Sequence, residues 1–211
     1  MPVRLTAGNL KLTGRDNAYL QLRAAPQSSI SMSEPFHVRL ATPADADLIG
    51  SHRARMFRDM GDVPPHLFDK FYSMSCDRLR EQLTSGEYVG WLASPSDSLD
   101  QIIGGAGVQL RRVMPHPLTS PDGEPGIAEG RHAIIVNVFT EPEFRRRGVA
   151  ALLMQHVIDW SRQVRLDRLV LHASDDGRAL YQQFGFVPTT EMEFSGTIPD
   201  KFSVPPSNLK S

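Results

Sequence analysis

Short apolar runs that alternate with polar residues, as in strands, are separated along this chain by longer segments in which apolar residues recur every three or four positions. Residues 36–40 alternate as a strand does. A polar turn at residues 94–98 separates two further runs and predicts a hairpin. The run at 133–139 is almost continuously apolar, as in a strand buried on both faces. The predicted strands cover residues 36–40, 88–93, 102–110, 133–139, 169–172, 186–187 and 192–194.

Helical spacing and terminal residues predict the helices between these strands. Thr42 is a good N-cap and Pro43 suits a first helical position, so a helix should run from there to about Met60 and end at Gly61. A second helix should begin after Pro64 and stop before Gly86. The third follows residue 148 and the last begins at Ser174 and ends at Gly185. On the third helix one apolar stripe is expected, formed by Val149, Leu152, Leu153, His156, Val157 and Trp160.

The order of these elements predicts the fold class. A strand–helix–strand–helix succession in the second half is typical of α/β proteins, and the early hairpin makes the sheet mixed. We therefore expect an α/β fold, which some schemes call α+β. Its single, mostly antiparallel sheet should have six to seven strands, with about four helices on its two faces.

Length, charge and cysteine content narrow the functional classes. The chain has 211 residues, enough for one domain, and its net charge of -1 disfavours a general nucleic-acid or membrane-surface role. The single cysteine, Cys76, allows no intramolecular disulfide and no thiol-based zinc site, and no metal site is expected. No apolar run reaches the length of a membrane span, and the N-terminus lacks the apolar core of a signal peptide. We expect a cytoplasmic protein.

Composition also suggests domain boundaries. Residues 1–34 are polar and irregular and predict a flexible N-terminal extension. Met32 resembles a second translation start, so that the ordered domain would begin near Ser33 and cover residues 35–195. Residues 196–211 should form an irregular tail. A Pro- and Gly-rich loop is predicted at 111–130, either covering a site or forming a tolerated surface insertion.

A basic, glycine-containing segment at the start of the third helix carries the strongest chemical signal. It reads Arg145-Arg146-Arg147-Gly148-Val-Ala150 and directly follows a predicted strand and a proline turn. Helix N-terminal amides and the helix dipole suit an anion there. Three arginines at a helix N-terminus oppose that dipole, which costs stability unless an anion binds there. The spacing matches neither a Walker loop nor the dinucleotide-binding pattern.

With its neighbours, this segment resembles the pyrophosphate-binding segment of the GNAT superfamily, the acetyl-CoA-dependent N-acetyltransferases. That family carries Arg/Gln-x-x-Gly-x-Gly/Ala after its fourth strand. The opening Val38-Arg-Leu-Ala-Thr-Pro-Ala-Asp45 resembles the family's first strand and helix, and Leu180-Tyr181-Gln-Gln-Phe-Gly-Phe186 resembles its C-terminal Leu-Tyr-x-x-x-Gly-Phe signature. The three segments occur in the family's order, over roughly residues 36–194.

The resemblance implies roles for particular residues. Main-chain amides from Arg145 to Ala150 would hold the CoA pyrophosphate, and the main chain of Val138 and Thr140 would pair with the pantetheine arm. The fourth and fifth strands would splay apart. Tyr181 would reach the CoA sulfur as general acid, since phenol and thiol acidities lie within about 1.5 pKa units of each other. The expected cofactor-binding residues are Val138, Phe139, Thr140, Arg145, Arg146, Arg147, Gly148, Val149, Ala150 and Ser174.

Two positions depart from the family's pattern. Ser174 stands where many members have an asparagine that contacts CoA, although a serine there is explained by capping the last helix. Ile134 stands where some members have a glutamate base. His132 or Glu129 could instead relay a proton through water, or the amine could lose its proton to water before it binds.

The implied activity is transfer of an acetyl group from acetyl-CoA to a small-molecule or peptide amine by direct attack in a ternary complex. The alternative is a non-catalytic acyl-CoA-binding domain of the same fold. A nucleic-acid module is disfavoured by the neutral net charge. We expect no nucleic-acid or membrane partner and leave a homodimer open. The family builds its acceptor pocket from the first two helices and later loops, which makes Phe57, Met60, Tyr72 and Trp91 candidate lining residues.

Overall fold

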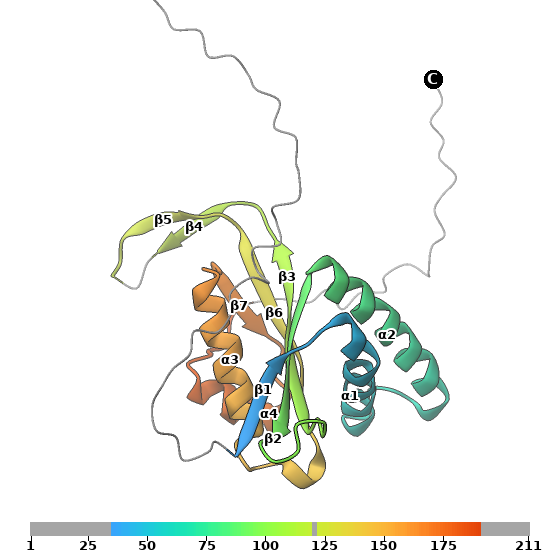
Figure 1. Ribbon diagram of the computed structural model, residues 1–211. Helices are drawn as coiled ribbons and strands as arrows, with labels where there is room; N and C mark the ends of the chain where they lie inside the picture. The colour runs from blue at the N-terminus through green and yellow to red at the C-terminus, as the bar shows by residue number, and fades with distance from the viewer. Residues whose placement is uncertain (1–34, 120–121, 191–211) are drawn as a thin grey trace, which may run out of the picture. The chain divides into compact units, whose positions relative to one another are not determined.

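The computed structural model describes residues 35–119 and 122–190 (Figure 1). A five-stranded sheet in the order β1-β2-β3-β6-β7 and a two-stranded sheet of β4 and β5 lie within these residues. The chain divides into two compact units, Met1–Ser174 and Asp175–Ser211. Both sheets and the first three helices belong to the first unit.

The five-stranded sheet is mostly antiparallel, as the sequence predicts. Each of the first three pairings is antiparallel, and only β7 runs parallel to its neighbour β6. Its three inner strands are largely buried, because the sheet is covered on both faces and inner strands can then carry long apolar runs. The strands are β1 (Phe36–Leu40), β2 (Tyr88–Pro95), β3 (Gly104–Arg112), β6 (Arg131–Thr140) and β7 (Arg168–Leu171).

The first two helices end where their sequence signals indicate, but at each predicted start a 3-10 turn precedes the α-helix. A 3-10 turn at Pro43–Asp45 leads into α1 (Ala46–Asp59), and both the backbone nitrogen and the hydroxyl of Thr42 donate to the Asp45 carboxylate at 2.8 and 2.9 Å. After a second 3-10 turn at Pro65–Leu67, α2 (Phe68–Ser85) ends at Gly86, which has a left-handed backbone with φ of 80°. Only glycine adopts that conformation without steric cost, so it terminates the helix.

Helices α1 and α2 cover one face of the sheet, and α3 (Val149–Gln163) covers the other (Figure 1). Two adjacent positions on β3 confirm this arrangement. A Cβ atom on Gly104 would meet Val149 of α3, whereas one on Gly105 would lie 3.8 Å from His52 of α1. Alternation along a strand therefore directs consecutive side chains to opposite helical layers.

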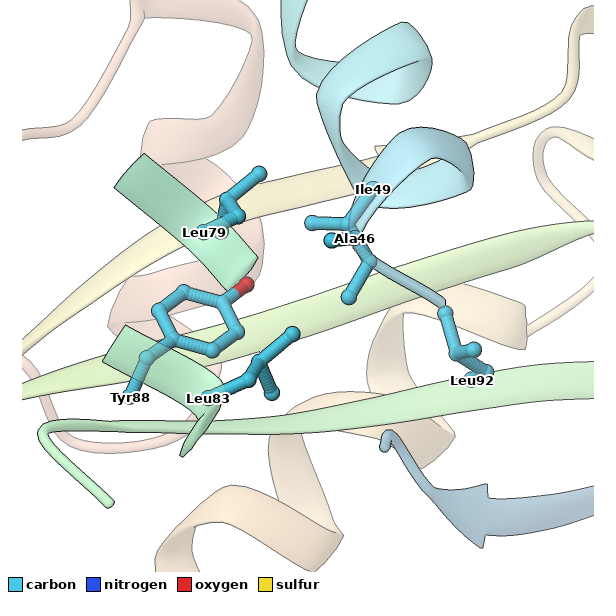
Figure 2. Close-up of a cluster of buried hydrophobic side chains, with 6 residues drawn as sticks. All are labelled: Ala46, Ile49, Leu79, Leu83, Tyr88 and Leu92. Atoms are coloured by element: carbon cyan, nitrogen blue, oxygen red, sulfur yellow. The ribbon is translucent and has the colours of Figure 1, made fainter. Parts of the chain in front are cut away.

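One part of the core lies between α1, α2 and β2. Figure 2 shows the ring of Tyr88 beside Leu79 and Leu83, and all three side chains are buried. Burying a leucine side chain stabilises a fold by about 1.5–3 kcal/mol. The apolar spacing on α2 thus holds α2 against the start of β2. The cluster consists of Ala46, Ile49, Leu79, Leu83, Tyr88 and Leu92.

Part of the segment predicted as a loop forms strands instead. β4 (His116–Thr119) and β5 (Pro125–Ala128) pair antiparallel within residues 111–130. Their prolines argue against a central strand, but a two-stranded sheet has only edge strands, where proline is tolerated. Within the described residues the main sheet has five strands and β4 and β5 form a second sheet, where a single sheet of six to seven strands was expected.

Three further expectations from the sequence concern the two late strands and His156. Phe186 is not in a strand, since its backbone nitrogen donates to Tyr181 at 3.1 Å in the turn that ends α4 (Asp175–Gln183). The strand predicted at residues 192–194 lies outside the described residues. His156 is exposed on α3, although the spacing placed it on the apolar stripe.

None of the described helices is long and apolar enough to cross a membrane. Within residues 35–119 and 122–190, no cluster of three or more His, Cys, Asp or Glu side chains is arranged to hold a metal ion.

Candidate functional site

A β-bulge interrupts β6 shortly before its end. Gly107 of β3 pairs with Val136 and Gly105 pairs with Phe139, so two residues of β6, Asn137 and Val138, lie opposite Ala106 alone. Asn137 has a φ of 58°, in the left-handed region that few residues other than glycine occupy. Such bulges re-aim side chains and end pairing near functional sites.

The same strand has an open edge beyond the bulge. β7 pairs with β6 only from His132 to Ile135, and no other described strand lies along that edge up to Thr140. This agrees with the splayed strands expected from the sequence. The Glu141 backbone nitrogen donates to Ile103 at 2.8 Å on the β3 side.

Alternation along the strand shows which main-chain groups face the open edge. Because the Glu141 amide faces β3, the main-chain N–H and C=O groups of Val138 and Thr140 point to the opposite, open edge. The Thr140 carbonyl accepts a hydrogen bond from Arg145 Nε at 3.2 Å. Both main-chain groups of Val138 and the amide of Thr140 can therefore pair with an extended ligand, as an added strand would.

Helix α3 begins with backbone amides that have no partner within the helix. Gly148 is its N-cap, with a φ of 88° and no side-chain cap, and no acidic residue lies in the first turn. The first hydrogen bond of the helix runs from the Leu152 backbone nitrogen to the Gly148 carbonyl at 2.9 Å. The three backbone amides before Leu152 therefore have no acceptor within the helix. A Cβ on Gly148 would meet nothing within 4 Å. Arg146 also has a left-handed backbone, with φ of 60°. Successive amides in such a turn converge and form an anion site.

The three arginines beside this helix end have different surroundings. Arg145 bonds Thr140 and lies 3.3 Å from the Asp59 carboxylate on α1, so it has a protein partner and needs no anion. Arg147 lies over the ring of Phe144 at 5.3 Å. Arg146 is exposed and forms no ion pair with the described residues. Among the described residues, therefore, only Arg146 and Arg147 leave positive charge at this helix N-terminus without an acidic partner.

Side chains of α1 hold the end of β6. Arg55 donates to both carboxylate oxygens of Glu141, at 2.7 and 2.6 Å, and these hydrogen bonds lower the pKa of Glu141. The buried ring of His52 stacks on Phe139 with ring centroids 4.6 Å apart. Burial lowers the pKa of His52 to about 4, so the ring is neutral near pH 7.

A second polar contact joins α1 to the bulge. Arg53 Nη1 donates to Asn137 Oδ1 at 2.7 Å, and Asn137 Nδ2 donates to the Tyr88 hydroxyl at 3.2 Å. Burial raises the pKa of Tyr88 to about 12, so the phenol stays protonated. Nothing in the sequence marked these residues, because partners 84 positions apart share no local pattern.

Comparison with known proteins decides the family. The sequence model of the acetyltransferase (GNAT) family matches residues 38–186. The chain belongs to the GNAT acetyltransferase family. A GCN5-related N-acetyltransferase from Ralstonia eutropha JMP134 is similar in structure, with a TM-score of 0.65 and 27% identity over 75% of this chain and 97% of that chain.

Two further acetyltransferase structures share the fold. A predicted acetyltransferase from Clostridium acetobutylicum, whose structure contains acetyl-CoA, has a TM-score of 0.61 and 24% identity over 76% of this chain and 96% of that one. An aminoglycoside acetyltransferase from an uncultured soil metagenomic sample has a TM-score of 0.54 and 16% identity over 77% and 98%. No curated protein sequence matches the chain significantly.

In this GNAT domain the two residues predicted as bases lie away from the open edge. His132 pairs with Arg168 in the closed part of β6, six residues before Val138 and roughly 20 Å along the strand. Its Nε2 is buried without a partner in the described residues, and burial lowers its pKa. Glu129 is exposed and lies 3.5 Å from Arg131. The role of either as a base stays a prediction.

The C-terminal GNAT signature, from Leu180 to Phe186, lies in the second unit. Tyr181 is on α4, its ring meets Phe186 at 6.3 Å between centroids, and burial raises its pKa. Ser174 is exposed just before α4 begins. The roles of both residues stay predictions.

Of the candidate acceptor residues, Trp91 belongs to the core. It is 4% exposed and meets Trp160 of α3 edge-on at 5.5 Å, on the sheet face away from α1. Phe57 instead packs against Phe71 of α2 at 5.3 Å. Met60 is exposed at the end of α1 and Tyr72 is half-buried on α2.

Proposed function

We propose that this protein is an N-acetyltransferase that moves an acetyl group from acetyl-CoA to an amine by direct attack in a ternary complex. One observation carries the proposal. The open edge at Val138–Thr140 and the uncapped N-terminus of α3 at Gly148 are separated by only a short turn, so one ligand can use both. CoA has the matching parts, an amide-bearing pantetheine arm and a pyrophosphate.

Each group of the site has a part in binding. The amides from Arg145 to Ala150 hold the pyrophosphate, and the side chains of Arg146 and Arg147 add positive charge. Val138 and Thr140 pair with the pantetheine amides. Arg145 stabilises the turn through its bonds to Thr140 and Asp59, and Phe139 supports the strand by packing on His52. Ser174 contributes a weaker contact.

The chemical step needs an acid for the leaving thiolate. The amine nitrogen forms a bond to the thioester carbon, and the carbon–sulfur bond breaks as the tetrahedral intermediate collapses. Tyr181 donates its phenol proton to the sulfur, and its raised pKa keeps it protonated until then. The proton of the attacking amine passes to His132 or Glu129 through water, or directly to bulk water.

The proposal also includes a domain organisation, a cellular location and an acceptor class. The catalytic domain covers residues 35–195, flanked by an N-terminal extension and a C-terminal tail, and acts in the cytoplasm. The lone Cys76 is consistent with a reducing compartment. The acceptor is a small-molecule or peptide amine.

Two measurements on the full-length protein test the proposal. Calorimetry should show 1:1 binding of acetyl-CoA, and a thiol assay should show CoA release that depends on both acetyl-CoA and an amine. Absence of acetyl-CoA binding would refute the proposed site. Binding without turnover for any amine would indicate a non-catalytic acyl-CoA-binding domain instead.

A further inference from the structure

We propose that Arg53 binds a carboxylate on the acceptor, so that the substrates of this enzyme are amines that also carry a carboxylate, such as amino acids. This inference rests on the proposed acetyltransferase function and goes further by naming the acceptor class. It starts from a half-buried arginine that has no acidic partner.

The surroundings of Arg53 leave most of its donors unused. A guanidinium has five N–H donors, and the one hydrogen bond of Arg53 within the described residues goes to Asn137. Its guanidinium carbon lies over the rings of Phe57 and Phe71, at 4.7 and 5.6 Å from their centroids. No carboxylate of the described residues pairs with it, whereas Arg55, two residues further along the helix, is paired with Glu141.

An arginine in this position carries an energetic cost that an anion would offset. Burial lowers the pKa of Arg53, yet a guanidinium remains protonated at any physiological pH. Partial burial of an unpaired charge is unfavourable, and aromatic rings compensate only in part. Charge complementarity therefore favours an anionic ligand.

The position of the group fits an acceptor better than it fits the cofactor. Asn137 immediately precedes Val138, whose main chain is expected to pair with pantetheine, and its side chain is directed to α1. The proposed pyrophosphate site lies at the start of α3, which covers the opposite face of the sheet (Figure 1). An amine that enters from the α1 side would thus meet Arg53 close to the thioester.

Asn137 and Tyr88 position the guanidinium. The Tyr88 hydroxyl accepts from Asn137 Nδ2, which turns the amide so that its oxygen faces Arg53. Tyr88 reaches β6 because β3 has no side chain at Gly107, where a Cβ would collide with the phenol oxygen. Asn137 and Tyr88 are therefore positioning residues, and Arg53 is the residue that binds the ligand.

The amount of charge favours a carboxylate over a phosphate. Since Glu141 neutralises Arg55, Arg53 supplies one uncompensated positive charge on this side of β6. One planar guanidinium matches one carboxylate in a two-point contact. A phosphomonoester, with a charge of about -1.5 to -2 at pH 7, would require further cations.

The test compares variants with matched substrates on the full-length protein. Amino acids and their carboxamides differ in the carboxylate and also in the pKa of the attacking amine, so the change in their kcat/KM ratio between the wild type and a variant isolates the contact with the carboxylate. We expect the wild type to prefer the carboxylates by about 10- to 100-fold. Arg53→Met should abolish the preference by raising KM for the carboxylates, with turnover of the carboxamides within about threefold.

Two further variants complete the design. Arg53→Lys keeps the charge without the fork and should retain part of the preference. Arg162→Met removes an exposed arginine of α3 that pairs with Asp159, and it should keep the wild-type ratio. If Arg53→Met fails to fold, the wild-type ratio and competitive inhibition by carboxylic acids that lack an amine decide the question instead.

The outcomes separate the two levels of inference. A ratio of kcat/KM for amino acids and carboxamides that is the same in Arg53→Met as in the wild type would overturn the role of Arg53 and leave the acetyltransferase intact. Failure to bind acetyl-CoA would overturn the proposed function, and the acceptor class with it.

Discussion

Arg55 forms a two-point hydrogen-bonded ion pair with Glu141, with Nη1 to Oε1 at 2.7 Å and Nη2 to Oε2 at 2.6 Å. The two residues are 86 positions apart, and the pair joins α1 to the residue that follows β6. Along the chain, Glu141 lies between the bulge at Asn137 and the turn at Arg145. The first helix therefore sets the position of the strand end that is proposed to hold the pantetheine arm.

The strength of this pair can be measured by a double-mutant cycle. Arg55→Met, Glu141→Gln and the double variant should give a coupling free energy of about 1–2 kcal/mol in urea unfolding, because the pair is two-pointed and partly buried. The exposed pair Arg162–Asp159 on α3 is the control, with an expected coupling of no more than about 0.5 kcal/mol. Additive effects at Arg55 and Glu141 would show that the pair contributes nothing.

Gly148→Asp should abolish acetyl-CoA binding while the protein still folds. The new carboxylate would stand at the helix N-terminus that is proposed to bind the pyrophosphate. Its negative charge would repel the pyrophosphate and displace it from that position. Gly148 has a φ of 88° and open space around it, so the variant should lose only about 1–2 kcal/mol of stability through backbone strain. Gly123→Asp matches it, with a φ of 84° and open space near the β4–β5 turn. Calorimetry showing normal acetyl-CoA affinity in Gly148→Asp would disprove the pyrophosphate placement.

Tyr181→Phe should lower kcat by roughly 10- to 10⁴-fold, since the variant cannot donate a proton to the leaving thiolate. Acetyl-CoA affinity should change little. The raised pKa of Tyr181 adds a second expectation, because the phenol loses its proton only above its usual range near pH 10. Activity of the wild type should therefore persist to alkaline pH. Unchanged turnover in Tyr181→Phe would remove this residue from the mechanism.

Stability should fall with acid because His52 resists protonation in the folded protein. Its folded pKa is about 4, below the usual value near 6.5, so between these values the unfolded chain binds more protons. Folding stability due to this group is thus highest above pH 6.5 and declines towards pH 4, by about 1–2 kcal/mol at pH 5.

Urea unfolding at pH 7 and pH 5 checks this prediction. His52→Gln should lose less free energy of unfolding between the two pH values than the wild type does. At pH 7 the variant should be less stable than the wild type, because it lacks the stack on Phe139. Replacing the exposed His37 of β1 by glutamine supplies the control, since it removes an imidazole without touching the contact between α1 and β6. An identical pH dependence in His52→Gln and the wild type would count against His52.

Local signals in the sequence predicted most of the regular elements. Thr42 and Gly86 mark helix ends in the sequence, and the structure places an N-terminal turn and a left-handed helix stop there, because caps depend on a few neighbouring residues. The run of three arginines was less informative. It suggested that all three need an anion, but Arg145 meets Asp59, 86 residues earlier in the chain.

The amino-acid sequence by itself determined the helices, the main strands, the family and the position of the helix start that is proposed to bind an anion, since these depend on spacing over a few residues. Tertiary structure decided the bulge at Asn137, the open edge beyond Ile135 and the pairing of β4 with β5. It also brought Arg53 to Asn137 and Arg55 to Glu141. These features arise where α1 packs on β6, and contacts between distant segments leave no periodic pattern in either one.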